Sequence, residues 1–218
     1  MKLYLSSYRI PDSTVLAELV GKPLAVVRVG IIPNAKDYYA TRARRVKIRL
    51  VTDYMQVQGM QPGIIDLNDY TDASKLAAEL KKYDLLWVMG GNTFCLREAM
   101  YGSGFDTAIH EAMDAGVVYA GESAGTCVAG TDLKGIELAD DPEYAETVIW
   151  KGLRLTPKFF IPHADNTDLR WAIQPVLDSR GNEPDTVVLN DNDAWVVDGQ
   201  NARKISGPKP DETEMAAA

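Results

Sequence analysis

The sequence predicts an α/β protein built on one doubly wound, mostly parallel sheet with helices on both faces. Short apolar runs alternate along the chain with longer stretches of helical periodicity, and two of those runs end directly in glycine-rich turns. Strands that alternate with helices form parallel βαβ units, and such units cover both faces of a sheet. Both observations indicate the same fold class.

The elements of the first half of the chain follow one another in strict alternation. Each expected strand is a short apolar run, and each expected helix repeats apolar residues every three or four positions. We expect strands at residues 2–6, 24–29, 63–67, 84–89 and 117–120, and helices at residues 13–21, 38–58, 73–83 and 93–115.

The length and composition indicate one domain. With 218 residues, of which 46% are hydrophobic and 25% charged, the chain can bury one sizeable core. We expect this domain to span residues 1–206, followed by a disordered tail at 207–218 that lacks apolar periodicity. Residues 131–146 are polar and acidic, and an intervening loop of this length often forms a lid or a binding loop.

The charge and hydropathy exclude two classes of partner. A net charge of −8 disfavours nucleic acid, because affinity for phosphates needs a basic field. The expected helix at 38–58 carries five cations, but they lie off its apolar stripe and are interpreted as a solvated face; the stripe comprises Tyr39, Ala43, Val46, Leu50, Tyr54 and Val57. No run approaches the roughly 20 apolar residues of a membrane span.

We expect a cytoplasmic protein without a metal or nucleotide cofactor. The N-terminus runs into a strand rather than a signal peptide. The two histidines and two cysteines form no ligand cluster of the usual spacing, and the turn at 90–93 is not a Walker loop. A disulfide between Cys95 and Cys127 is not expected in the cytosol, and Cys127 is interpreted as buried filler.

Residues 121–125 read Gly-Glu-Ser-Ala-Gly and come directly after the apolar run that ends at Ala120. A strand that delivers a serine into a tight, glycine-flanked turn before a helix is a nucleophile elbow. Ser123 is therefore the candidate nucleophile. The alternative is an ordinary glycine-rich turn between a strand and a helix, so other residues must decide.

A second glycine turn offers hydrogen-bond donors. The apolar run at 84–89 ends in Gly90 and Gly91, where backbone N–H groups are exposed. Such donors stabilise the oxyanion that forms when an activated serine attacks a carbonyl group. The N–H groups of Gly91 and Ala124 are the predicted pair, although glycine could also serve packing alone at this turn.

The candidate base is a histidine. His163 ends the apolar run at 159–162, at the carboxyl end of a predicted strand where open α/β sheets place their ligands. A serine nucleophile needs a base within hydrogen-bond reach, and histidine is the usual choice. His110 lies in an amphipathic helix and is interpreted as part of its solvated face.

A third group should orient the imidazole of the base. Residues 187–197 contain two apolar runs interrupted by an acidic turn, and Asp191 in that turn is our choice. Asp193 and Asp165 remain open, because an Asx-rich turn is also a common feature of hairpins.

Together these residues resemble the serine peptidase family of aspartyl dipeptidase (peptidase E) and cyanophycinase, which has a class I glutamine amidotransferase-like fold. The resemblance rests on the motifs at 90–94, 121–125, 161–163 and 191–197, in the family's order and spacing, and spans residues 1 to about 205. It implies a Ser-His-acid hydrolase that works through an acyl-enzyme. The implied roles are nucleophile for Ser123, base for His163, acid near Asp191, and oxyanion hole at Gly91 and Ala124.

The chain departs from the family pattern at two positions. Glu122 stands where aspartyl dipeptidases carry a bulky aromatic residue and cyanophycinases a small polar one. An alignment on Trp195 in the aspartyl dipeptidase manner places the acid at Asn192 instead of Asp191. The preference for a particular substrate is therefore less firmly indicated than the reaction class.

The resemblance further implies a small peptide substrate with an N-terminal aspartate. Glu122 or the acidic loop at 137–141 could bind the free α-amine, and Asn92 and Arg170 are candidates for the carboxylate. We expect a monomer or a homodimer.

Other functions stay open: a cyanophycinase-like amide hydrolase, an esterase of the α/β-hydrolase type, and a binding protein without catalysis. Against the esterase, no histidine follows His163, whereas α/β-hydrolases place theirs after the acid.

Overall fold

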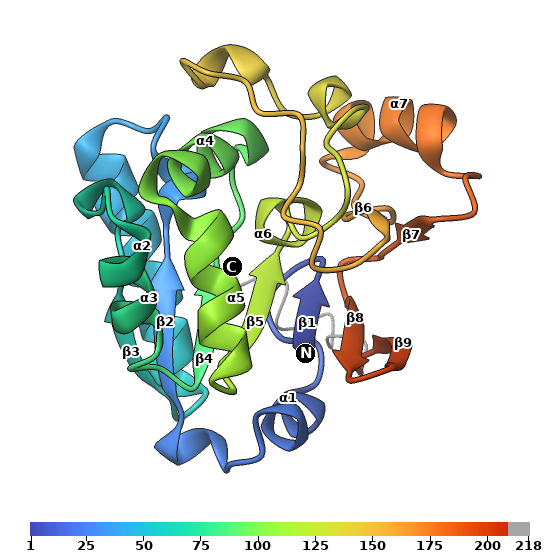
Figure 1. Ribbon diagram of the computed structural model, residues 1–218. Coiled ribbons are helices and arrows are strands. Elements are labelled where there is room, and N and C mark those ends of the chain that lie inside the picture. The colour runs from blue at the N-terminus through green and yellow to red at the C-terminus, as the bar shows by residue number, and fades with distance from the viewer. Residues whose placement is uncertain (209–218) are drawn as a thin grey trace.

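The centre of the computed structural model, which describes residues 1–208, is a seven-stranded sheet in the order β3-β2-β4-β5-β1-β8-β9 (Figure 1). The first five strands of the chain are parallel, whereas β8 pairs antiparallel with β1 and β9 with β8. The mostly parallel α/β fold expected from the sequence is confirmed. The strands are β1 (Lys2–Ser6), β2 (Arg28–Ile32), β3 (Gln61–Ile64), β4 (Leu85–Val88), β5 (Val118–Glu122), β8 (Asp193–Asp198) and β9 (Asn201–Ser206).

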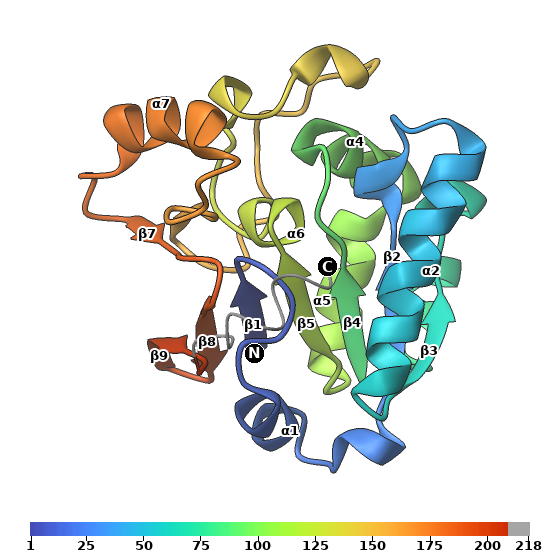
Figure 2. The same ribbon diagram turned by 180° about the vertical axis from the view of Figure 1, so that it is seen from behind.

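Helices cover both faces of this sheet because the side chains of its strands alternate between them (Figures 1 and 2). In β4, Leu85 and Trp87 pack on one face, and Leu86 and Val88 on the other. The first face packs against α1 (Ser13–Val20) and α2 (Thr41–Val57). The second packs against α3 (Ala73–Leu80), α4 (Thr93–Ser103) and α5 (Phe105–Asp114).

The single helix expected at 93–115 is two helices. Gly104 has a φ of 77°, and its N–H closes the end of α4 by bonding to the carbonyl oxygens of Met100 and Tyr101. Glycine adopts this left-handed conformation without steric cost, so α4 ends there and α5 begins in a new direction.

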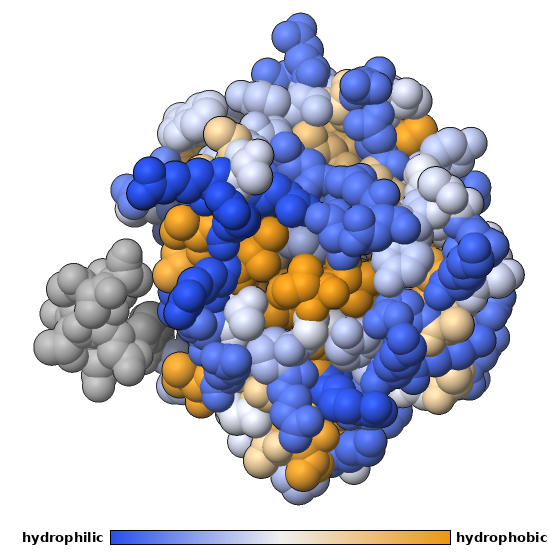
Figure 3. Space-filling model, turned by 90° about the vertical axis from the view of Figure 1, so that its left-hand side faces the viewer, coloured by the Kyte–Doolittle hydropathy of each residue, from blue (hydrophilic) through white to orange (hydrophobic). Residues whose placement is uncertain are grey.

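The apolar stripe of α2 is not the face that packs on the sheet. Val46, Leu50 and Val57 are exposed, whereas Met55 is buried and Val51 packs beside it. The inward face is rotated from the one the sequence pattern indicates, so that Ile48, Val51 and Met55 meet the core. Arg44 pairs with Asp37 and Asp66 at 2.7 Å each beside it. Figure 3 views the molecule from the β3 side, where hydrophobic residues lie among mostly hydrophilic ones.

Two expected strands are shifted along the chain. Residues 24–26 form a short 3-10 turn after Pro23, and β2 begins only at Arg28. Strand β3 begins at Gln61 and contains Pro62. Proline is accommodated there because β3 is an edge strand, where a missing N–H leaves no inner partner unsatisfied.

The remaining elements gather beyond the carboxyl end of the parallel strands (Figure 1). A short helix, α6 (Ala124–Cys127), follows β5, and β6 (Phe159–Ile161) pairs in parallel with β7 (Thr186–Val188) in a second sheet. Helix α7 (Arg170–Arg180) links these two strands. The expected long loop at 131–146 contains the 3-10 turns Ile136–Leu138 and Pro142–Tyr144.

Two expectations concern the chain's end and its relation to membranes. Only Gly207 and Pro208 of the expected tail are described, and their carbonyl oxygens accept hydrogen bonds from Asn192 at 2.7 and 2.5 Å. The rest of that tail, 209–218, lies outside the described residues. None of the helices in residues 1–208 combines the length and the apolar character needed to cross a membrane.

Candidate active site

Ser123 occupies a sharp, strained turn between β5 and α6. Its φ of 53° and ψ of −110° belong to a region that side chains rarely adopt. The turn is this tight because Gly121 and Gly125 touch: a Cβ on Gly121 would collide with the backbone of Gly125. The hydroxyl of Tyr119 also donates to the carbonyl oxygen of Gly125 at 2.7 Å. The serine side chain therefore projects from the N-terminal end of α6, as in a nucleophile elbow.

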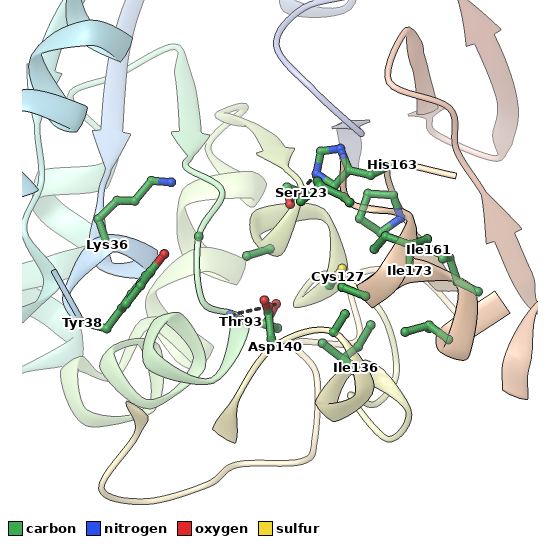
Figure 4. Close-up of a pocket in the computed structure, with 17 residues that line it drawn as sticks. Lys36, Tyr38, Thr93, Ser123, Cys127, Ile136, Asp140, Ile161, His163 and Ile173 are labelled. Atoms are coloured by element: carbon green, nitrogen blue, oxygen red, sulfur yellow. Dashed lines mark hydrogen bonds between the residues drawn. The ribbon is translucent and has the colours of Figure 1, made fainter. Parts of the chain in front are cut away.

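Three side chains from separate segments form a hydrogen-bonded chain, of which Figure 4 shows Ser123 and His163. Nε2 of His163, which follows β6, lies 2.9 Å from Oγ of Ser123. Nδ1 of the same ring lies 2.5 Å from Oδ1 of Asp191, which follows β7. The parallel pairing of β6 and β7 brings the base and the acid together, because the carboxyl ends of parallel strands meet at one edge.

The carboxylate of Asp191 has further donors. Asn166 donates to its Oδ2 at 2.6 Å, and Ser7 donates to its Oδ1 at 3.5 Å. Burial by itself would favour the protonated acid, but the hydrogen bonds from His163, Asn166 and Ser7 outweigh it and hold the pKa of Asp191 below its usual value. The group facing the imidazole is therefore an anion at neutral pH.

The other candidates for the third position have different partners. Asp165 accepts the backbone N–H of Asp191 at 2.8 Å, which fixes the turn. Asn192 donates toward the end of β9, and Asp193 accepts from Ser206 at 2.5 Å and from the backbone N–H of Asn190 at 2.9 Å. Within the described residues, Asp191 alone among these four contacts the ring of His163.

The two predicted backbone donors border the same cavity as Ser123. Gly91 has a φ of 145°, and a Cβ there would collide with the carbonyl oxygen of Ala35, so only glycine fits. Ala124 is the first residue of α6, where a helix leaves its N–H groups without helical acceptors. In the part of the chain that the structure describes, the N–H of Gly91 also lacks a hydrogen-bond acceptor.

A cavity of about 290 Å³ opens beside Ser123 and His163. Its wall is mostly apolar and comes from β6, α6, α7 and the 131–146 loop (Figure 4). The polar groups at its opposite side are Lys36, Tyr38, Thr93 and Asp140. The apolar wall consists of Cys127, Ile136, Ala139, Ile161, Leu169, Ala172, Ile173 and Val176.

Asp140 ties the 131–146 loop to α4 and faces this cavity. Its Oδ2 accepts the backbone N–H of Thr93 at 2.9 Å and the Thr93 hydroxyl at 2.5 Å. Burial raises the pKa of the Asp140 carboxyl, while the hydrogen bonds from Thr93 and the charges of His163 and Lys36 act in the opposite direction. A cationic group that entered the cavity would favour the ionised form.

The three residues predicted to bind substrate lie in different environments. Asn92 caps α4: its Oδ1 accepts the N–H groups of Phe94 and Cys95, and its Nδ2 donates to Asp141 at 2.8 Å, so both ends of the amide are engaged. Arg170 is exposed at the start of α7, outside the cavity lining. Glu122 lines a second cavity on the α2 side of the sheet.

Sequence reasoning missed three polar residues at this site, namely Ser7, Lys36 and Asn166, whereas Asp140 lies in the acidic loop at 137–141 that was expected to bind the amine. Ser7 follows the carboxyl end of β1, so the rule that ligands gather at strand ends could have found it. Asn166 lies in the Asx turn after His163 and accepts the N–H groups of Asp168 and Leu169. Lys36 ends the 3-10 turn Asn34–Lys36, and nothing in its local sequence marks it.

Comparisons with known proteins show which sequences and structures this chain resembles. A profile of peptidase family S51 matches residues 13–205. An uncharacterized peptidase of Listeria innocua is 32% identical over 116 residues, which are 52% of this chain and 56% of that protein. Peptidase E of Streptomyces coelicolor is 30% identical over 139 residues, which are 64% of this chain and 52% of that protein. The matched chain thus spans little more than half the length of either relative.

Solved structures share the fold. The crystal structure of a candidate peptidase E protein from Listeria monocytogenes superposes with a TM-score of 0.79 at 22% identity, covering 95% of this chain and 98% of the other. A peptidase from an acI-B1 Actinobacterium gives a TM-score of 0.69 at 15% identity, covering 95% of each chain. With a family profile that matches most of its length, this chain belongs to peptidase family S51, the peptidase E family that its motifs resemble.

Proposed function

We propose that this protein is a serine peptidase in which Ser123 is the nucleophile, His163 the general base and Asp191 the orienting acid. The observation that carries the proposal is the unbroken hydrogen-bonded chain from Ser123 Oγ through both ring nitrogens of His163 to Asp191. A serine beside a positioned base, which is itself held by a carboxylate, is the arrangement that acyl transfer needs.

In the proposed reaction, Ser123 Oγ attacks the carbonyl carbon of the peptide bond while its proton moves to Nε2 of His163. The C–N bond then breaks, and His163 gives this proton to the leaving amine, which departs and leaves Ser123 acylated. Water adds to the acyl carbon with His163 again accepting the proton. The acid product leaves as that proton returns to Ser123, and Asp191 stays ionised throughout.

The backbone N–H groups of Gly91 and Ala124 are proposed to stabilise the oxyanion. Both border the cavity beside Ser123, and both are rigidly placed by a glycine turn and a helix start. Donors fixed in advance at the place where negative charge develops lower the barrier more than donors that must reorient.

The substrate is proposed to be a short peptide with a free α-amine and an N-terminal aspartate. Asp140 supplies an acceptor for the amine, since it lines the cavity and is already fixed by Thr93. Lys36 is the one cation in the cavity lining, so it is the group in the described chain that can pair with the aspartate carboxylate.

A second candidate is a peptide with an apolar N-terminal residue. The wall formed by α6, α7 and β6 is apolar, and a carboxylate placed against it would lose its hydration without gaining hydrogen bonds. An aliphatic side chain buried there would instead gain about 1.5–3 kcal/mol from transfer out of water.

Covalent labelling tests the nucleophile. A fluorophosphonate should modify Ser123 in the native protein, and peptide mass spectrometry should locate the adduct on that residue. Ser123→Ala and His163→Ala should abolish or strongly slow labelling, whereas His110→Ala, an exposed residue on α5, should not. Modification of another residue, or undiminished labelling of His163→Ala, would refute the assignment.

Hydrolysis of a peptide panel tests the substrate. Asp-Leu and Leu-Leu, each with a free and an acetylated N-terminus, should separate the two side-chain preferences and the need for the amine. Lys36→Met should reduce kcat/KM for Asp-Leu more than for Leu-Leu if Lys36 pairs with the aspartate carboxylate. Hydrolysis of p-nitrophenyl acetate without any peptide cleavage would favour an esterase, and cleavage of blocked peptides a cyanophycinase-like amide hydrolase.

A further inference from the structure

A second cavity of about 270 Å³ lies on the α2 side of the sheet, next to the nucleophile turn. Its floor includes Gly90, which packs against Ser123, and Glu122, which precedes Ser123 in sequence. Its wall comes from α2 and the segment after β1. Lys36 borders this cavity as well as the one beside His163, so the two are neighbours. Apolar and aromatic side chains of the described chain complete this lining, among them Tyr8, Leu50, Val51, Tyr54 and Met89.

Gly90 packs directly against the nucleophile turn at the floor of the second cavity. A Cβ at Gly90 would lie 2.9 Å from Cβ of Ser123 and 3.5 Å from its Oγ. The missing side chain therefore lets the floor of the second cavity approach Ser123 closely. Ser123 lines the first cavity and lies beside a residue that lines the second.

Three cations line the second cavity: Arg9, Lys36 and Lys47. Within residues 1–208, none of them forms an ion pair with a carboxylate. The guanidinium of Arg9 lies 5.2 Å from the ring of Tyr54, and Nζ of Lys47 lies 4.8 Å from the ring of Tyr39. Aromatic contacts hold Arg9 and Lys47 in place, and no carboxylate among residues 1–208 lies within ion-pair distance of either.

Glu122 is the one carboxylate in this lining, and it does not neutralise the three cations. Its Oε2 accepts a hydrogen bond from the indole of Trp87 at 3.3 Å, on the sheet side of the cavity. Burial raises the pKa of Glu122 and lowers that of Lys36, and their mutual attraction opposes both shifts. The cavity remains cationic in a chain whose net charge is −8.

We propose that this cavity, through Arg9 and Lys47 with Lys36 at its border, binds the C-terminal carboxylate of the residue that leaves when a dipeptide is cleaved. The inference rests on the proposed function, since it takes Ser123 as the point of attack. A dipeptide is a zwitterion whose amine fits beside Asp140 in the first cavity and whose carboxylate fits among the cations of the second. The opposite orientation would place the amine against three cations and the carboxylate against Asp140.

Binding to Ser123→Ala, which cannot form an acyl-enzyme, tests this proposal without turnover. Isothermal titration should be run with Asp-Leu and Leu-Leu, each as the free acid and as the C-terminal amide. The free acid should bind about tenfold or more tightly than the amide, because the neutral amide cannot form charge-assisted hydrogen bonds with the cations. The ratio of the dissociation constants, amide over free acid, should fall toward one when Arg9→Gln and Lys47→Gln are added to Ser123→Ala.

Arg45→Gln is the matched control, because Arg45 is also a cation on α2 but is exposed and lies outside the second cavity. It should keep the full preference for the free acid. Equal binding of acid and amide, an unchanged preference in the Arg9 and Lys47 variant, or no binding of any of these peptides would overturn the proposal. If the free acid binds more tightly than the amide but the wild-type protein does not cleave the peptides, the proposed peptidase function is wrong while the carboxylate-binding site is supported.

Discussion

The hydroxyl of Ser7 accepts the backbone N–H of His163 at 2.7 Å and lies 3.5 Å from Oδ1 of Asp191. Ser7 is completely buried at the end of β1, and His163 has a φ of 62°, a strained value for a residue with a side chain. One hydroxyl therefore links the central sheet to both the backbone of the candidate base and the carboxylate that orients it. Ser7 is a positioning residue, because it acts through His163 and Asp191.

Ser7→Ala should reduce kcat roughly tenfold with little change in KM, since a loosened base loses reactive geometry without altering peptide binding. Steady-state kinetics on a cleaved dipeptide measures both constants. Ser103→Ala is the control, because Ser103 is also buried but its hydroxyl bonds to Met100 within α4. A KM effect alone, or equal losses of kcat in both variants, would argue against a positioning role.

Asp191→Asn and Asp193→Asn should separate chemistry from stability. The first should lower kcat by about 10⁴, because an amide favours the wrong tautomer of His163, while leaving the folded state nearly intact. The second should leave kcat largely unchanged but reduce the free energy of unfolding by about 1–3 kcal/mol, since Asp193 is buried with Ser206 and Lys204 as partners. Steady-state kinetics and urea unfolding of both variants test this prediction. A larger loss of kcat in Asp193→Asn than in Asp191→Asn would make Asp193 the orienting acid.

The contribution of Asp193 to stability should depend on pH. Burial alone would raise its pKa, but hydrogen bonds from Ser206, the Asn190 N–H and Lys204 hold the pKa below its usual value. A carboxyl group with a depressed folded-state pKa stabilises the fold above its unfolded pKa of about 3.9, and the contribution disappears as the pH falls through the folded value. The difference in unfolding free energy between wild type and Asp193→Asn should therefore be full at pH 7 and shrink in acid. A difference that grows on acidification would contradict this.

Thr93→Val should loosen the 131–146 loop, because Asp140 loses the shorter of its two hydrogen bonds to Thr93. We expect KM for free-amine peptides to rise about threefold to tenfold, as for the loss of one charge-assisted hydrogen bond, and proteases to cut the loop faster. Thr52→Val is the control, since the Thr52 hydroxyl bonds only to the carbonyl of Ile48 in α2. Unchanged KM and unchanged cleavage would remove Asp140 from amine binding.

The sequence predicted the parts of the fold and site where the local backbone geometry restricts which residue types can be present. The Gly-Glu-Ser-Ala-Gly turn and the Gly-Gly turn were recognisable because backbone contacts at Gly125 and Gly91 admit no side chain. The geometry brings Ser123, His163 and Asp191 into one hydrogen-bonded chain: His163 and Asp191 follow the paired strands β6 and β7 of the second sheet, and Ser123 follows β5 of the central sheet.

The parts that sequence reasoning did not find depend on distant partners. Residues of the α2 stripe such as Val46 and Leu50 are exposed because the orientation of the helix is set by tertiary contacts, including the pairing of Arg44 with Asp37 and Asp66. Lys47 was interpreted as part of a solvated face, yet it borders the second cavity together with Gly90 and Glu122, which lie at the ends of two other strands. The hydrophobic periodicity of one helix does not predict which loop will pack beside it.

The strained backbone of Ser123 supports catalysis but lowers the thermal stability of the protein. A φ of 53° with a ψ of −110° is a conformation that glycine adopts far more readily than serine. Ser123→Gly should therefore melt at a higher temperature than the wild type although it has lost its nucleophile. Selection for thermal resistance alone would tend to discard the catalytic residue, and only selection on turnover would retain it.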